Sequence, residues 1–351
     1  MRPLRFRILW GWKTAVCALL GMALCTFLSC TTPFSVEKER EENPAARSER
    51  PRVFRSEHYV LYLPAEEISA EALAEQFLGG RDRAWAIVDA NGRSFFNAKD
   101  VVAIPLREEN PGGLTDQGYQ TVPVLCYRGF VTGKERAMHI RAETFRRQMG
   151  FLQEHGYRVV GLVDLLEFLH YQRGLPENAV VITVDGANQS VYEVAYPILR
   201  AFGYPAALFV PVEAVDAYEE TLNWDQIREM KANGWEIGVQ AGTQFDLASP
   251  SDPVIDSENR KKIRDSLLKS KQILDEKLNQ DTIALAFPFT HVTPGILHLA
   301  QSLGYRLGMT VRPGANPFFA DPLALRREQV FEAEDLSFQM RMKTFKLEPL
   351  P

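Results

Sequence analysis

The sequence predicts an α/β protein in which a barrel of alternating strands and helices follows a small unit of two strands and two helices. From residue 122 onward, short apolar runs alternate with amphipathic stretches at the spacing of repeated β-α units. Glycines follow several of the amphipathic stretches, at the position where helices commonly end. The chain has 351 residues, of which 46% are hydrophobic and 24% charged. This length and composition suit one barrel of about 200 residues plus a small globular domain.

The elements of the barrel follow from apolar periodicity and from the glycine stops. Seven apolar runs rich in β-branched residues are the predicted strands: Val122–Tyr127, Val159–Leu162, Ala179–Val184, Ala206–Val210, Glu236–Val239, Ile283–Phe287 and Arg306–Val311. Six amphipathic stretches are the predicted helices: Ala142–Glu154, Leu162–Arg173, Val191–Phe202, Trp224–Ala232, Arg260–Leu278 and Pro294–Ser302. Seven strands in such an alternation indicate an α/β barrel.

Residues 57–107 form the predicted small unit, and residues 108–119 link it to the barrel. Its elements are a strand, two helices and a closing strand: Tyr59–Leu63, Ala70–Phe77, Arg83–Ala90 and Val101–Pro105. This βααβ order resembles the lysin-motif domain, which implies binding to N-acetylglucosamine polymers such as peptidoglycan. Glu66-Glu67-Ile68 departs from the Gly-Asp-Thr usual in that family. A glycan-binding unit and a packing adaptor without a ligand therefore both remain open.

The first thirty residues have the layout of a secretory signal peptide. Basic residues precede an uncharged apolar run from Thr14 to Leu28, which is short for a transmembrane span. The run ends in Phe27-Leu28-Ser29-Cys30, which resembles a bacterial lipobox. The resemblance implies a bacterial envelope lipoprotein, lipid-anchored to the membrane through Cys30, and an uncleaved anchor is the alternative. Thr31 in place of aspartate favours the outer membrane, facing the periplasm.

Residues 31–56 are polar and punctuated by proline, and we interpret them as a tether.

Cysteine usage agrees with an exported protein that has no internal disulfide. Cys17 and Cys25 lie in the signal and Cys30 would carry lipid, so Cys126 is alone in the mature domains. Because Cys126 lies in an apolar strand, a buried small hydrophobe is favoured over a nucleophile.

One predicted strand presents a carboxylate at the place where α/β barrels keep their chemistry. The run Ala179–Val184 ends at Asp185, on the carboxyl side of a buried strand. Thr183-Val184-Asp185-Gly186 and the segment from Gln240 to Gln244 resemble two motifs of the polysaccharide deacetylase family, Thr-Phe/Ile-Asp-Asp-Gly and His-Ser/Thr-x-x-His. The resemblance implies a distorted (β/α) barrel of about seven strands over residues 120–351, and hydrolysis of a carbon-nitrogen amide bond on N-acetylated glycans.

The resemblance also assigns roles, and most of them fall on residues that cannot perform them. Asp185 matches the general base, while Gly186, Gln240 and Gln244 fall on the three metal-ligand positions. A divalent metal is normally held by carboxylate, imidazole or thiolate, whereas a carboxamide oxygen is a weak ligand and glycine offers no side chain. We therefore expect no metal cofactor here, and we interpret Asp185 as a vestigial base. Zinc or another divalent metal is expected only if other residues supply ligands.

Three further segments resemble the groove of the same family. Pro123 to Phe130 resembles its opening phrase and places Tyr127 and Arg128 in the groove, with Arg128 where histidine is usual. Phe287-Pro288-Phe289 resembles Tyr-Pro-Tyr, which implies that the Phe289 amide helps form an oxyanion hole. Thr310 to Asp321, ending near Arg327, resembles the final strand and loop. Trp224 could stack on a sugar, and His291, just past a strand end, could act with Asp185.

Three hypotheses follow from the sequence. The first is an envelope lipoprotein with a deacetylase-like barrel that binds or organises cell-wall glycan or peptidoglycan without turnover. The second is an active N-deacetylase with a remodelled site, for example His291 with Asp185, and the third is a purely structural module. The net charge of −5 leaves no basic footprint, so nucleic acid is not an expected partner. The identity of any protein partner stays open.

Overall fold

The computed structural model describes residues 50–98, 100–106, 110–134, 136–242, 257–287, 292–331 and 335–348. The predicted signal, Cys30 and most of the predicted tether lie outside the described residues. None of the helices within these ranges is both long enough and apolar enough to cross a membrane.

The amino-terminal unit is a three-stranded antiparallel sheet with two helices. The sheet has the order β1-β2-β5, and its elements are β1 (Arg52–Arg55), β2 (Tyr59–Leu63), β3 (Ile68–Ser69), α1 (Ala70–Phe77), α2 (Ala84–Asn91), β4 (Phe95–Phe96) and β5 (Val102–Pro105). Alternate residues of β2 and β5, among them Val60 and Ile104, are buried with Leu73 and Ile87 of the helices. The predicted β-α-α-β order is present. Strand β1 differs from the sequence analysis, which places Arg52–Arg55 in the tether.

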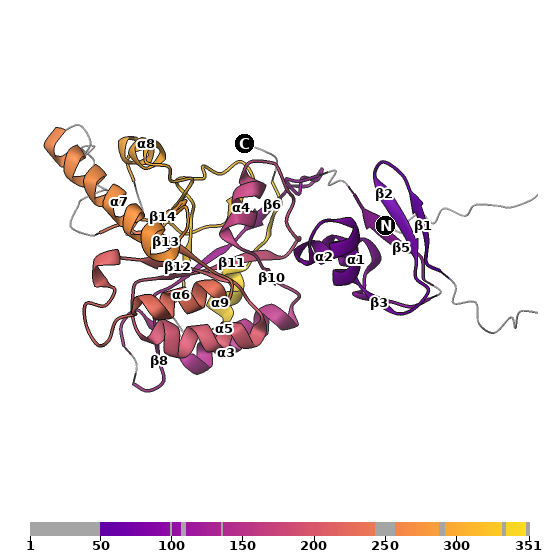
Figure 1. Ribbon diagram of the computed structural model, residues 1–351, viewed down its shortest axis with the longest axis horizontal. Helices are drawn as coiled ribbons and strands as arrows, with labels where there is room; N and C mark the ends of the chain where they lie inside the picture. Colours follow the sequence, from indigo (N-terminus) through magenta and orange to yellow (C-terminus); the bar gives the residue numbers. More distant parts are fainter. Residues whose placement is uncertain are drawn as a thin grey trace, which may run out of the picture. The chain divides into compact units, whose positions relative to one another are not determined.

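The second part of the chain is built on a curled parallel sheet (Figure 1). Seven strands lie on its path in the order β15-β14-β13-β12-β11-β7-β17. Their bounds are β7 (Val124–Tyr127), β11 (Ala179–Asp185), β12 (Ala206–Val210), β13 (Trp235–Gln240), β14 (Ala284–Ala286), β15 (Leu307–Met309) and β17 (Glu328–Gln329). The prediction of an α/β barrel of about seven strands is thereby confirmed.

One strand of the path was not expected from the sequence, and it joins the two sheet edges. β17 pairs with β7, while Leu325, just before it, pairs in parallel with Met309 of β15. The predicted strand at Val159–Leu162 is only β10 (Arg158–Val159), which pairs with β11 beside the main path. β17 has only two residues, so it shows no apolar alternation from which the sequence could predict it.

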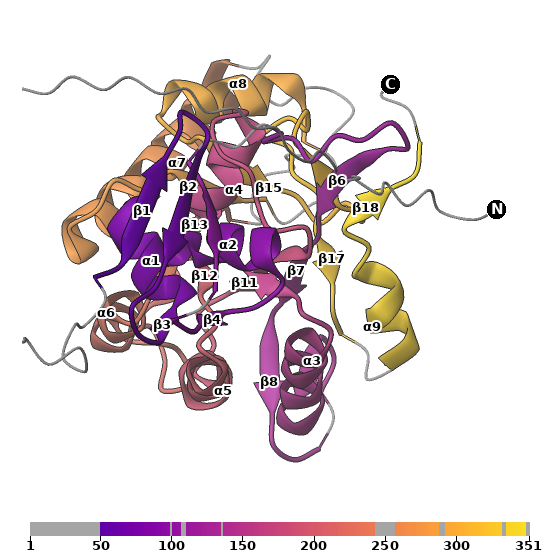
Figure 2. The ribbon, with the colours of Figure 1, turned by 90° about the vertical axis from the view of Figure 1, so that its right-hand side faces the viewer.

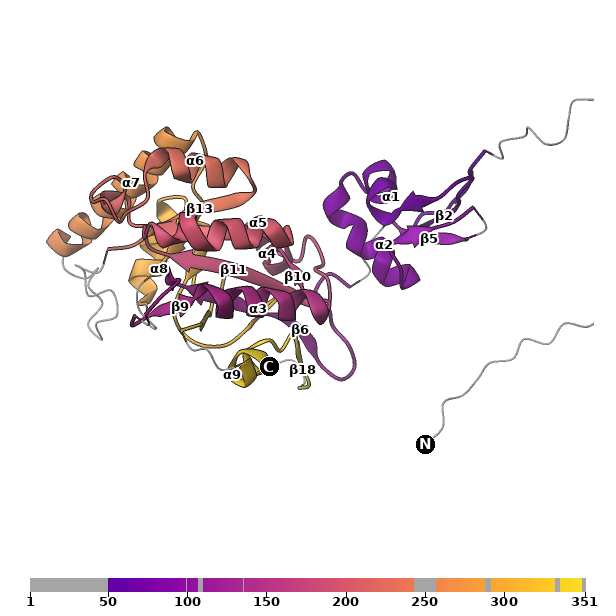
Figure 3. The ribbon, with the colours of Figure 1, turned by 90° about the horizontal axis from the view of Figure 1, so that it is seen from below.

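Seven helices pack against the sheet in the described residues, most of them on its outside, while α4 packs with the inward side chains. They are α3 (Ala142–Glu154), α4 (Leu162–Leu169), α5 (Tyr196–Phe202), α6 (Trp224–Ala232), α7 (Ser257–Leu278), α8 (Pro294–Ser302) and α9 (Asp335–Arg341). Figures 2 and 3 show α3, α5 and α6 along one outer side of the sheet. The predicted helix Val191–Phe202 begins as a π-helical turn over Val191–Ala195. Pro197 has no N–H for the Glu193 carbonyl, which accounts for the irregular turn.

Side-chain alternation divides the core into an outer and an inner layer. In β11, Val180, Ile182 and Val184 pack in the cluster shared with the outer helices. Val181 packs in a second cluster, with inward residues of the other strands and with α4. Because residues two apart share a face, Thr183 and Asp185 point into the barrel with Val181.

Two further short pairings complete the topology. Strands β8 (Gly129–Val131) and β9 (His139–Arg141) pair with each other. Strand β6 (Tyr119–Val122) pairs with β16 (Asn316–Pro317) and with β18 (Phe345–Lys346). The carboxyl-terminal segment thus packs beside the start of the barrel.

Candidate functional site

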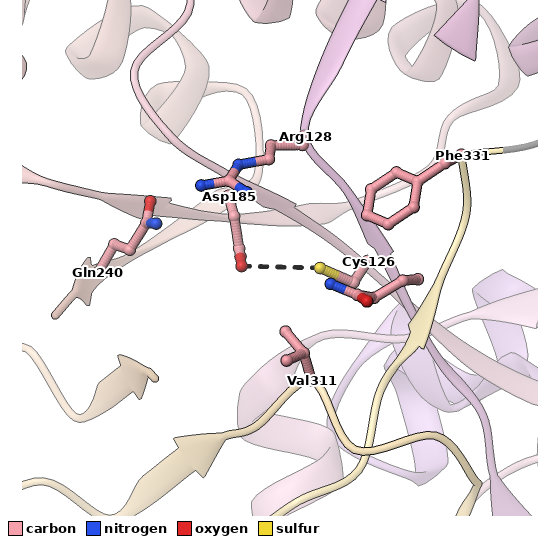
Figure 4. A pocket seen from close by; sticks show the side chains of 7 residues that line it. Cys126, Arg128, Asp185, Gln240, Val311 and Phe331 are labelled. Atoms are coloured by element: carbon pink, nitrogen blue, oxygen red, sulfur yellow. Dashed lines mark hydrogen bonds between the residues drawn. The ribbon is translucent and has the colours of Figure 1, made fainter. Parts of the chain in front are cut away.

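The strand ends surround a small cavity at the mouth of the barrel (Figure 4). Its lining residues come from five strand ends and the segments that follow them: Cys126, Arg128, Asp185, Gln240, Val311, Gln329 and Phe331. The structure therefore brings together three residues singled out from the sequence, Asp185, Gln240 and Arg128. The cavity volume is about 30 Å³, which is room for one or two water molecules. We name it the mouth cavity.

Asp185 is held by a buried arginine. Arg327 Nη1 donates to Asp185 Oδ1 at 2.6 Å, and Arg327 Nη2 donates to Oδ2 at 2.7 Å. The same guanidinium donates to the Thr183 hydroxyl at 3.2 Å and, through Nε, to the Thr310 carbonyl at 2.8 Å. Arg327 is 0% exposed and Asp185 is 6% exposed. This is a two-pronged, charge-assisted pairing, the geometry in which arginine binds carboxylates most strongly.

The electrostatics of the pair favour the charged form of Arg327. Burial by itself would lower the pKa of Arg327, but the Asp185 charge raises it above the ordinary arginine value. The guanidinium carbon also lies 5.5 Å from the centre of the Phe209 ring, a cation-π contact. A general base needs a free oxygen within hydrogen-bonding reach of water. Both Asp185 oxygens accept strong hydrogen bonds from Arg327, and Oδ2 also accepts the Cys126 thiol, so few of the lone pairs of this carboxylate remain for water.

Cys126 belongs to the same cluster. Its thiol lies 3.6 Å from Asp185 Oδ2, to which it donates. Burial raises the pKa of the Cys126 thiol to about 12, although the nearby Arg327 charge acts in the opposite direction. Because thiolate is the nucleophilic form, this cysteine is inert at neutral pH. The sequence-based expectation of a buried cysteine agrees with its 2% exposure.

The residues at the metal-ligand positions do not fit a divalent cation. Gly186 has no side chain, and its backbone has φ +108° with its N–H bonded to the Phe209 carbonyl. Gln240 is 8% exposed, and its Oε1 has no hydrogen-bond partner among the described residues. Gln244 lies outside the described residues. In the part of the chain that the structure describes, no three His, Cys, Asp or Glu side chains group as a metal site. One amide oxygen and one arginine-bound carboxylate are a poor donor set.

Several predicted groove residues lie elsewhere. Tyr127 is buried against α3, and its hydroxyl donates to Gln148 Oε1 at 2.9 Å. Phe287 is likewise buried in the outer core cluster. Trp224 starts α6, where the Lys277 ammonium lies 5.9 Å from its ring centre. In each case the strand or helix face directs the side chain away from the mouth cavity. Pro288, Phe289 and His291 lie outside the described residues.

The residue that the sequence analysis missed is Arg327. It was noted only as the end of a family-like phrase, with no role. Leu325 is buried inside the barrel and Arg327 follows two positions later, in the extended segment just before β17, so both point into the barrel. That spacing is the only signal in the sequence, and Arg326 beside it makes the pattern look like a surface charge pair.

The barrel and its mouth define the class of protein. Residues 172–308 match the polysaccharide deacetylase family model. The chain therefore contains a polysaccharide deacetylase-like domain. The match ends before Arg327, so the partner of Asp185 lies beyond the matched region.

Particular relatives place the domain more closely. The poly-beta-1,6-N-acetyl-D-glucosamine N-deacetylase of Escherichia coli (strain K12) is 27% identical over 220 residues, which are 51% of this chain and 32% of that protein. This chain thus spans about a third of that relative. The solved deacetylase PplD of Streptococcus pyogenes, in complex with acetate, is 24% identical with a TM-score of 0.55, covering 65% of this chain and 99% of that one. IcaB of Ammonifex degensii is 23% identical with a TM-score of 0.55, covering 63% and 96%. These structures support the fold of the barrel.

Proposed function

We propose that this chain is an envelope protein whose deacetylase-like barrel binds N-acetylated glycan without hydrolysing it. The observation that carries the proposal is the double hydrogen bond between Asp185 and Arg327 inside the barrel mouth. It commits the one carboxylate at the motif position to an internal partner. The related Escherichia coli poly-beta-1,6-N-acetyl-D-glucosamine N-deacetylase suggests the ligand class, which is a polymer of N-acetylglucosamine.

The chemistry of amide hydrolysis supports a silent site. Without a metal, water keeps a pKa near 15.7 instead of about 7, and the acetamide carbonyl loses several kcal/mol of Lewis-acid stabilisation. Asp185 would have to activate such water while both of its oxygens stay bonded to Arg327. Gln240, in contrast, keeps a spare acceptor in the wall of the mouth cavity. A neutral acceptor suits an N–H or hydroxyl donor better than a cation.

The location of the protein is part of the same proposal. A lipid on Cys30 would anchor it in the bacterial envelope, at the outer membrane facing the periplasm, with the polar stretch before residue 52 as the tether. The amino-terminal βααβ unit would add a second contact to peptidoglycan in the manner of a lysin motif. The two helices and the strands of this unit, which share one hydrophobic core, support that assignment.

An active N-deacetylase with a remodelled site is the second candidate. It is favoured by the similarity of the chain to the Escherichia coli N-deacetylase. It would require ligands from residues outside the described ranges, with His291 as the candidate from the sequence. Zinc would then be the expected cofactor.

The test combines turnover and binding on the full chain. Acetate release would be measured from N-acetylglucosamine oligomers and from poly-β-1,6-N-acetylglucosamine, with added zinc, with cobalt and with a chelator. Sedimentation with purified peptidoglycan and with the polymer would measure binding. We expect binding without acetate release in all three conditions. Stoichiometric zinc with turnover that the chelator abolishes would establish the second candidate instead. Sedimentation with neither glycan would leave a purely structural module.

A further inference from the structure

We infer that a pocket between α3 and α9, on the flank of the barrel and away from its mouth, is a subsite for one N-acetylated sugar ring. Its wall consists of residues of α3 and α9: Arg147, Gln148, Gly150, Phe151, Glu154, Phe338 and Gln339. Its volume is about 230 Å³. We name it the flank pocket. The mouth cavity, at about 30 Å³, has room for one small polar group of a glycan, whereas the flank pocket has room for a single small ring.

Gly150 is the first observation that points to a ligand. It lies in the interior of α3, where glycine costs about 1 kcal/mol relative to alanine. Nothing in the packing requires a glycine, because a Cβ built at this position would meet no heavy atom within 4 Å. Its φ is not among the positive values either. The absent side chain therefore has one structural effect, which is to leave the flank pocket open.

Gln148 is the second and independent observation. The residue is 1% exposed, and its Oε1 accepts the Tyr127 hydroxyl hydrogen bond at 2.9 Å. Its Nε2 has no partner among the described residues. A buried amide donor without a partner costs about 1–3 kcal/mol. Gln148 is one of the residues that line the flank pocket, so the carbonyl of a bound ligand is the natural acceptor for this N–H.

The remaining walls match the other parts of an acetamido sugar. Phe151 and Phe338 meet edge to face, with ring centres 5.9 Å apart, and offer apolar surface to the C–H face of a pyranose and to the acetyl methyl. Arg147 and Glu154 bring one charge of each sign to the exposed side, where sugar hydroxyls can donate and accept. An apolar wall with a few convergent polar groups is the usual composition of a small-ligand site. Figure 2 shows α3 and α9 as neighbours at the edge of the barrel.

Filling the pocket is the direct test. Affinity for the trimer of N-acetylglucosamine would be measured by titration calorimetry on the full chain, for the wild type, Gly150→Leu and Arg146→Leu. A leucine at position 150 fills the pocket, because Gly150 is part of its lining. Arg146 is an exposed residue of the same helix outside the lining, so Arg146→Leu introduces the same side chain without filling the pocket. We expect Gly150→Leu to weaken binding at least about tenfold and Arg146→Leu to stay within about twofold.

The acetyl group is tested with a matched ligand. The trimer of glucosamine has the same rings without the acetamido carbonyl, and we expect it to bind at least about tenfold more weakly to the wild type. Equal affinity of the wild type and Gly150→Leu for the acetylated trimer would overturn the subsite. Absence of trimer binding by the wild type would overturn it as well. Polymer binding that Gly150→Leu leaves unchanged would overturn the subsite while leaving the proposed function of the barrel intact, because this variant does not touch the mouth cavity.

Discussion

The substitution Asp185→Asn distinguishes a structural carboxylate from a catalytic one. The amide keeps the size of the side chain but removes its charge, and it leaves the Arg327 cation in the barrel with no counter-charge. Arg327 is 0% exposed, and two hydrogen bonds of 2.6 and 2.7 Å join the pair. Removing one partner of a buried pair costs about 3–5 kcal/mol, because the other charge stays desolvated. We expect the free energy of unfolding to fall by about that amount.

The assay is equilibrium unfolding in urea, and the chain offers a matched control. Asp225 also pairs with an arginine, Arg228, but its side chain is 93% exposed. Since exposed pairs contribute about 0–1 kcal/mol, Asp225→Asn should change the stability little. The double variant Asp185→Leu/Arg327→Met removes both charges, and it should cost less than the sum of the single substitutions. A loss below about 1 kcal/mol for Asp185→Asn would refute the reasoning.

Three other predictions concern the same barrel. Since burial raises the pKa of the Cys126 thiol to about 12, iodoacetamide at pH 8 should label its peptide, read by mass spectrometry, only after unfolding; rapid native labelling would contradict this. The raised folded-state pKa contributes stability that is complete below the unfolded value near 9 and is lost as pH rises through about 12. Buried tyrosines with raised pKa values add a decline of their own, so urea unfolding above pH 9 should decline more steeply in the wild type than in Cys126→Ser. Gly186→Ala should destabilise by about 1–3 kcal/mol because φ is +108°, whereas Gly150→Ala, with equally open space, should stabilise by about 0.5–1 kcal/mol; equal effects on urea unfolding would exclude backbone strain. Glu236 accepts the first N–H groups of α4, so Glu236→Ala should cost about 1–2 kcal/mol in thermal unfolding and the exposed Glu219→Ala less than about 0.5 kcal/mol.

The sequence predicts the scaffold well because periodicity reports burial. The helices α3, α6 and α8 have the predicted bounds, and the long apolar runs from Ala179 and Ala206 are central strands. Alternation along β11 also places Asp185 inside the barrel mouth, where the family resemblance expects it. These features depend on local patterns of five or more residues, which a single sequence contains.

The chemistry of the site depends on pairs that no local pattern reveals. Arg327 lies 142 residues from Asp185, and it follows another arginine in a short segment before β17 that shows no alternation. The positive φ of Gly186 could not be predicted from the sequence either, because the family resemblance marks this glycine only as a metal-ligand position without a side chain. Tyr127 and Phe287 were expected in the groove from resemblance, but strand alternation turns both toward the helices. Orientation and long-range pairing therefore required the structure.

The distance along the chain between Asp185 and Arg327 also affects how the protein can be made. The chain emerges with its amino-terminal end first, so Asp185 becomes available well before Arg327, which lies 142 positions further on. Until then the carboxylate has no counter-charge, and burying it alone would cost several kcal/mol. We expect the nascent barrel to remain open at β11 until its last strands emerge. Pairing of Arg327 with Asp185 is then one of the last steps in closing the barrel.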